Sequence, residues 1–269
     1  MRIGRVLLGR GGEGPADEVW ARLDPESSVE LLDLSDLRRE GRALGPAEGL
    51  TIVRPVTPTS TVVCLLGNWK GRDGRDGPSF FIKPNSSLIS DGDAIVLPDG
   101  CPTVVYEPEI AAVIGRTCRG VTPAEARAHV VGWTCVNDVT ATDLGMTTNS
   151  PFLPGKSYDT FGVLGPVVET ELDPDDTALR ALINGKVVTD TVTSRMNWST
   201  DEVISWVSGF MTLRPGDLVC FGTPPEIEPI RAGDVVEVEV EGIGTLRNPV
   251  MSAAGAAAAV GAGVAVAAD

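Results

Sequence analysis

The sequence predicts an α+β fold in which a curled, strand-rich sheet carries a few outer helices. Its 269 residues include 31 Gly and 20 Pro, while aromatic residues make up only 5%. That balance favours many turns and short strands over long helices. Apolar residues make up 42% of the chain, which is enough for a sizeable core. Short apolar runs recur between turn residues, whereas helix-start patterns stand out at two places.

Residues 1–57 are expected to form a small N-terminal subdomain. Short apolar runs at Ile3–Leu8 and Leu31–Leu34 alternate there with polar loops, and Pro55–Pro58 is a connector rich in Pro and Thr. The main domain, residues 58–251, is expected to begin with a buried strand at Thr61–Leu66. Further strands are expected in four runs: Ser79–Ile82, Ala94–Leu97, Thr103–Tyr106 and Ile110–Ile114.

Two helices are expected from their capping residues. The segment Thr122–Glu125 places Thr before Pro and Glu, and Ser199–Glu202 is a second capping box that begins an apolar helix running to Phe210. Residues 252–269 are nearly all Ala, Gly and Val. We expect them to form a poorly ordered, low-complexity tail, because they lack the Leu, Ile and Phe of a membrane span.

Charge and cysteine content exclude several classes of function. The chain has 22 Lys and Arg against 37 Asp and Glu, a formal net charge of −15, so neither nucleic acid nor an anionic membrane is an expected partner. None of the five cysteines forms a Cys-x-x-Cys pair, which argues against a disulfide framework and a thiolate zinc site. Without signal-peptide features at its start, the protein is expected in the cytoplasm.

Glu107 and Glu109 stand two residues apart in an apolar run. On a strand this spacing points both carboxylates to one face. Two buried like charges repel each other unless a cation holds them, so a hard divalent ion is one interpretation. A solvated strand face carrying Glu is the alternative, and the pattern alone leaves both open. The alternating glutamates of a later run are interpreted as such a face: Glu237, Glu239 and Glu241.

Three further residues could belong to a site. Asp138 follows an apolar run and could supply a third carboxylate at a strand end, with Asp143 as a neighbour or a cap. Lys156 lies in Pro-Gly-Lys-Ser, but a phosphate-binding loop would need Gly at position 150, where Ser stands. Beside a metal, Lys156 could instead neutralise an enolate or a carboxylate. The only histidine, His129, falls inside an expected helix, which leaves none for a Ser-His-Asp triad.

Read in order, the motifs from about Pro58 to Val250 resemble the fumarylacetoacetate hydrolase family. Each motif is short, and their order and spacing make the resemblance specific. They include Phe81-Ile-Lys-Pro-Asn-Ser-Ser-Leu, Tyr106-Glu-Pro-Glu-Ile, Asn137-Asp138, Gly155-Lys156-Ser-Tyr-Asp-Thr-Phe, Leu213-Arg-Pro-Gly-Asp, Gly222-Thr-Pro and Glu241-Gly-Ile-Gly-Thr-Leu-Arg-Asn.

The resemblance implies a β-rich roll or sandwich, a homodimer, and Mg²⁺ or Mn²⁺ as cofactor. It implies that three carboxylates hold the metal: Glu107, Glu109 and Asp138. It matches Lys156 to the family's active-site lysine and Thr223 to a threonine near the substrate's oxygens, and we place Asp143 with them in the catalytic site. The expected substrate is a 2-oxo or 1,3-dioxo acid that reacts through a metal-bound enolate, by hydrolysis of a C–C bond or by decarboxylation.

The chain departs from the family where water would be activated. Arg72 stands where hydrolytic members carry a His, and Arg75 stands near their Glu; arginine stays protonated and cannot act as a base. Thr142 replaces an arginine that faces the substrate. We assign substrate binding to Asn68, Arg72 and Arg195. The departures leave a tautomerase, a dehydratase, a specialised biosynthetic enzyme and a non-catalytic binding protein as alternatives.

Overall fold

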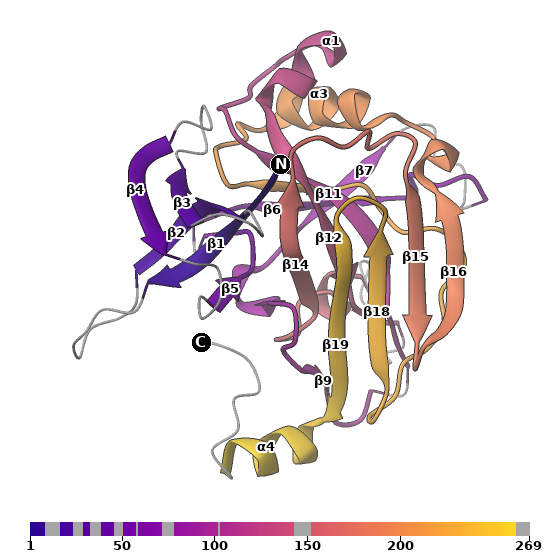
Figure 1. Cartoon of the computed structure of the whole chain (residues 1–269). Helices are drawn as coiled ribbons and strands as arrows, with labels where there is room; N and C mark the ends of the chain where they lie inside the picture. The colour runs from indigo at the N-terminus through magenta and orange to yellow at the C-terminus, as the bar shows by residue number, and fades with distance from the viewer. Residues whose placement is uncertain are drawn as a thin grey trace.

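The computed structural model describes residues 1–8, 17–23, 29–32, 39–45, 51–57, 59–71, 78–101, 103–142 and 152–261. A sheet of twelve strands dominates the fold (Figure 1), in the order β4-β3-β2-β1-β14-β12-β11-β17-β6-β7, with β5 beside β1 and β8 beside β14. Its strands are β1 (Arg2–Leu8), β2 (Asp17–Arg22), β3 (Val29–Leu32), β4 (Arg39–Gly45), β5 (Thr51–Val53), β6 (Val62–Leu66), β7 (Ser79–Lys83), β8 (Leu88–Ile89), β11 (Pro108–Ile114), β12 (Val130–Asp138), β14 (Gly162–Glu169) and β17 (Leu218–Cys220).

Two smaller sheets complete the strand content. A five-stranded sheet packs against the main one, in the order β16 (Lys186–Val192), β15 (Ala178–Ile183), β18 (Val235–Val240), β19 (Gly244–Ser252) and β9 (Ile95–Leu97). A short pair joins β10 (Val104–Val105) to β13 (Thr140–Ala141). The helices are α1 (Pro123–Ala126), α2 (Phe152–Gly155), α3 (Thr200–Phe210) and α4 (Ala253–Gly261), with 3₁₀ turns at Asn85–Ser87, Arg127–His129 and Thr193–Arg195.

The main sheet is curled. Strands β7 and β12 are separated by β6, β17 and β11, a distance of about 19 Å in a flat sheet at about 4.8 Å per strand. The ammonium of Lys83 at the end of β7 nevertheless lies 2.7 Å from the carboxylate of Asp138 at the end of β12. The chain then crosses through Asn85–Ser87 to β8, which pairs in parallel with β14. The predicted strand-rich α+β fold with a curled sheet is therefore confirmed.

Strand β11 is buried on both faces. Its residues Ile110, Ala112 and Ile114 join the larger core cluster, which includes side chains of the five-stranded sheet and α3. Ala111 and Val113 face the second core cluster. Because both faces are covered, the strand reads as one continuous apolar run from position 110 onward. The alternation places residues 107 and 109 on the face of the second cluster.

Both predicted helix starts are confirmed. Thr122 with Glu125, and Ser199 with Glu202, form the two reciprocal capping boxes at the starts of α1 and α3. Among the described residues, no helix has both the length and the apolar character needed to cross a bilayer.

The two ends of the chain refine the expected organisation. The tail expectation is corrected for Ala253–Gly261, which forms α4 because alanine has the strongest helix propensity; residues 262–269 lie outside the described residues. At the other end, β1 pairs with β14 of the main sheet, and Ile3 packs into the second core cluster. The N-terminal strands thus extend the main sheet, and a separate subdomain over residues 1–57 stays a prediction.

Candidate metal centre and active site

Neighbouring strands bring the three predicted carboxylates together. Glu107 directly precedes β11 and Glu109 lies within it, while Asp138 ends the antiparallel partner β12. The backbone N–H of Asp138 donates to the carbonyl of Glu107 at 2.9 Å, and the backbone N–H of Glu107 donates to Oδ1 of Asn137 at 3.0 Å. These hydrogen bonds fix the ends of the two strands on which the carboxylates stand.

The cluster is buried and its donor atoms converge. Glu109 and Asp138 are each 1% exposed and Glu107 is 8% exposed, and one oxygen from each of them lies within 4.8 Å of the others. An all-oxygen set of three carboxylates suits a hard divalent ion such as Mg²⁺ or Mn²⁺. The solvated-face alternative instead describes β18, where Glu237 and Glu239 are half-buried on the outer side of the strand.

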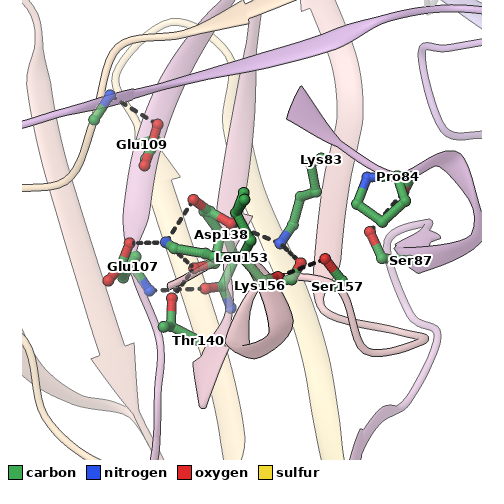
Figure 2. A network of polar contacts seen from close by, with 12 residues as sticks. Lys83, Pro84, Ser87, Glu107, Glu109, Asp138, Thr140, Leu153, Lys156 and Ser157 are labelled. Atoms are coloured by element: carbon green, nitrogen blue, oxygen red, sulfur yellow. Dashed lines mark hydrogen bonds and ion pairs between the residues drawn. The ribbon is translucent and has the colours of Figure 1, made fainter. Parts of the chain in front are cut away.

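Two buried ammonium groups complete the cluster (Figure 2). Lys156 Nζ lies 2.7 Å from Oδ2 of Asp138 and 2.5 Å from Oε2 of Glu107. Lys83 Nζ lies 2.7 Å from Oδ1 of the same aspartate and donates to the backbone carbonyl of Lys156 at 2.6 Å. Each oxygen of Asp138 therefore faces a different lysine. Both lysines are 2% exposed, so the five charged groups share one largely dry site.

The pKa values of two of the carboxylates, Glu109 and Asp138, are shifted in opposite directions. Burial raises the pKa of Glu109 well above its ordinary value, and the Asp138 carboxylate adds to this. Burial also acts on Asp138, but Lys156 and Lys83 outweigh it, so the pKa of Asp138 is lowered. Burial opposes the charge of Lys156, yet Asp138 and Glu107 together raise its pKa. Without an ion, the Glu109 carboxylate therefore holds a proton more readily than the Asp138 carboxylate.

The turn after β17 supplies one fixed donor and one free hydroxyl. Gly222 has φ +82° and its N–H donates to Oε2 of Glu109 at 2.8 Å; a Cβ at this position would lie only 3.3 Å from the carbonyl oxygen of Leu65. Glycine is thus favoured there by conformation and by space. The next residue, Thr223, is 6% exposed, and its Oγ1 has no hydrogen-bond partner among the described residues. A buried hydroxyl of this kind suits a ligand oxygen.

The other predicted substrate-binding residues lie differently. The side chain of Asn68 is buried, donates to the carbonyl of Phe221 at 3.1 Å and accepts from the backbone N–H of Trp198 at 3.0 Å. These contacts give it a structural role, and a substrate contact stays a prediction. Arg195 is exposed and donates to Oγ1 of Thr191. Arg72 and Asp143 lie outside the described residues.

Sequence reasoning missed Lys83 as a site residue. A signal was present, because Phe81 and Lys83 occupy alternate positions of a short strand and Phe81 is an inward residue by its apolar character. Lys83 is therefore on the inward face as well, where a lysine is seldom buried without a partner. What the sequence does not show is that the partner comes from β12.

Comparisons with known proteins show which family the chain is similar to. The family model for the C-terminal domain of fumarylacetoacetate (FAA) hydrolase matches residues 67–251. Protein Rv2993c of Mycobacterium tuberculosis is 38% identical over 269 residues, covering 93% of this chain and 98% of that protein. The mitochondrial oxaloacetate tautomerase Fahd2a of Rattus norvegicus is 33% identical over 251 residues, covering 84% and 80%. The crystal structure of 5-carboxymethyl-2-hydroxymuconate delta-isomerase from Mycobacterium smegmatis matches with a TM-score of 0.83 and 34% identity, covering 94% and 100%.

Proposed function

The chain belongs to the fumarylacetoacetate hydrolase family, and on this premise we propose that it is a divalent-metal-dependent tautomerase of a 2-oxo acid. Oxaloacetate is the substrate to test first, because the similar rat protein is named an oxaloacetate tautomerase. A solved relative at 34% identity is likewise named an isomerase. Hydrolysis of a C–C bond and decarboxylation, which the family resemblance suggested first, become the alternatives.

The observation that carries the proposal is the buried cluster of three carboxylates and two lysines. Carboxylate oxygens within 4.8 Å of one another can hold one hard ion, and the fit of donor type and burial supports Mg²⁺ or Mn²⁺. When bound, such an ion withdraws electrons from a 2-oxo group and makes the neighbouring C–H more acidic. Interconversion of keto and enol forms needs no activated water, which suits a chain with Arg72 in place of the expected histidine.

The protein's own groups would divide the remaining work. Lys156 Nζ contacts the carboxylates of Glu107 and Asp138 but would not itself be a ligand of the ion. We therefore assign proton transfer to this ammonium. If Glu107 and Asp138 held an ion, they would stabilise the ammonium less, and the pKa of Lys156 would fall toward a range useful for proton transfer. The unpartnered hydroxyl of Thr223 would donate to a substrate oxygen. The roles of Arg72 and Asp143 stay proposals.

The test follows loss of the enol form of oxaloacetate by ultraviolet absorbance, with Mg²⁺ or Mn²⁺ and with a chelator. The wild-type protein is expected to accelerate ketonisation above the rate with metal alone, and Glu109→Gln and Lys156→Met to remove most of that gain. Glu239→Gln, a half-buried glutamate on β18, is the matched control and should keep the wild-type rate.

Release of CO₂ in the same assay separates the alternatives. Enol loss without CO₂ supports the tautomerase, whereas CO₂ release at the rate of enol loss would assign a decarboxylase. A wild-type protein no faster than metal ions alone, but still able to bind Mn²⁺, would favour the non-catalytic binding protein. A homodimer and a cytoplasmic location remain predictions, which light scattering and cell fractionation would check.

A further inference from the structure

Lys83 is the one charged group of the cluster to which the proposed function gives no task. The chain contains 22 Lys and Arg, of which only four are Lys, at positions 70, 83, 156 and 186. Two of these four are fully buried, and both lie in the same site. A chain that uses arginine almost everywhere else therefore places the narrower ammonium here, where space is limiting.

The contacts of Lys83 join the two halves of the site. Its Nζ lies 2.7 Å from Oδ1 of Asp138, the oxygen that faces away from Lys156. The same Nζ donates to the backbone carbonyl of Lys156 at 2.6 Å. One ammonium thus holds a predicted metal ligand by its side chain and the predicted proton carrier by its backbone (Figure 2).

The path of the Lys83 side chain is narrow. A Cβ at Gly162 would lie 3.1 Å from both Cδ and Cε of Lys83, and 2.5 Å from Cδ2 of Leu88. Gly162 is also the sheet partner of Asp138 in the β12–β14 pair. The stem of Lys83 therefore runs past the strand beside its own carboxylate partner, through space that a side chain at position 162 would fill.

We propose that Lys83 is a positioning residue of the metal centre, an inference that rests on the proposed metal-dependent function. Its ammonium holds Oδ1 of Asp138 and the backbone carbonyl of Lys156, and so fixes the carboxylate that would hold the ion beside the ammonium of Lys156. Partners that hydrogen-bond to metal-ligating carboxylates orient them, and their loss typically costs about 10–100-fold in metal affinity or activity.

Charge and positioning predict opposite results for removal of Lys83. A positive charge close to a cation site repels the cation, so by Coulomb's law alone Lys83→Met should bind a divalent ion more tightly. Loss of orientation instead leaves a buried carboxylate oxygen of Asp138 without its partner and should weaken binding. The sign of the change in affinity therefore decides between the two effects.

The experiment measures binding of Mn²⁺ alone by titration calorimetry to the full-length protein, without substrate. Wild type and the control Lys186→Met, an exposed lysine at the start of β16, should bind with the same Kd. Lys83→Met should bind at least about tenfold more weakly. A general loss of stability would lower the melting temperature but would not change the Kd of the folded protein well below that temperature.

A second variant keeps the inference testable if Lys83→Met does not fold. Lys83→Arg keeps the charge but replaces the ammonium by a wider planar head, so charge alone predicts no change and positioning predicts weaker Mn²⁺ binding. Equal or tighter binding by the folded lysine variants would overturn the inference while leaving the metal site in place. Absence of Mn²⁺ binding by wild type would overturn the proposed function itself, and the role of Lys83 with it.

Discussion

Substitution of Gly155 by Ala tests how the backbone places Lys156. A Cβ on Gly155 would lie 2.2 Å from the carbonyl oxygen of Ala141, a backbone atom of β13 that cannot rotate away. Ordinary contacts of this kind lie beyond about 3 Å, so α2 and β13 must separate by about 1 Å. Overpacking of a filled site costs about 1–3 kcal/mol. At about 2–4 °C per kcal/mol for a chain of this size, the melting temperature should fall by about 2–12 °C.

The same separation should displace Lys156 and weaken Mn²⁺ binding, measured by calorimetry on the folded variant. Gly209→Ala is the matched control, because a Cβ in this turn of α3 meets nothing within 4 Å. Alanine is the better helix former by about 0.5–1 kcal/mol, so this melting temperature should rise by about 1–4 °C. A Gly155→Ala protein that melts no lower than wild type and binds Mn²⁺ equally well would refute the close approach of α2 to β13.

Three further outcomes are expected. Burial and the Asp138 carboxylate raise the pKa of Glu109, so binding of Mn²⁺ at a pH below that pKa should release about one proton, and the affinity should increase as pH rises. Calorimetric heats of Mn²⁺ binding that do not depend on the ionisation enthalpy of the buffer would contradict this. Thr223→Val removes a buried, unpartnered hydroxyl, so stability should be kept while KM for oxaloacetate rises about tenfold; an unchanged KM would exclude a substrate contact. A hydrogen bond to Cys220 and burial raise the pKa of the Cys64 thiol, and burial outweighs that hydrogen bond to raise the pKa of the Cys220 thiol. A thiol reagent should therefore leave both unmodified in the native protein, and rapid labelling of either would contradict their burial.

Local pattern was sufficient to predict two of the helices, α1 and α3, and the shared face of two carboxylates. The capping boxes at Thr122 and Ser199 predicted the starts of α1 and α3, because a cap depends only on residues three apart. The spacing of Glu107 and Glu109 predicted a shared face, and the structure agrees, because one oxygen of each carboxylate lies within 4.8 Å of the other. It did not predict burial, because the same alternation in β18 leaves its glutamates half-exposed. The difference comes from what packs on each sheet face.

Contacts between segments far apart in the chain could not be predicted from the sequence. The pairing of Lys83 with Asp138 depends on the curl of a sheet whose order places three strands between them. The structural role of Asn68 depends on backbone atoms of Trp198 and Phe221, far along the chain. Neither contact can be predicted from local propensity, because each depends on how distant segments of the chain pack together. The helix α4 was missed for another reason: a low-complexity composition was given more weight than the helix propensity of alanine.

Charge balance explains why two lysines accompany three carboxylates. With all five groups ionised the cluster carries a net charge of −1, and a buried excess charge is costly, which agrees with the raised pKa of Glu109. If Glu109 lost its proton and a divalent ion bound, the ion would change the net charge of the fully ionised cluster from −1 to +1. Without Lys83 the same ion would give a site with no net positive charge to attract an anion. In the proposed function, Lys83 would therefore supply positive charge that attracts an anionic 2-oxo acid, in addition to holding Asp138 and Lys156 in place.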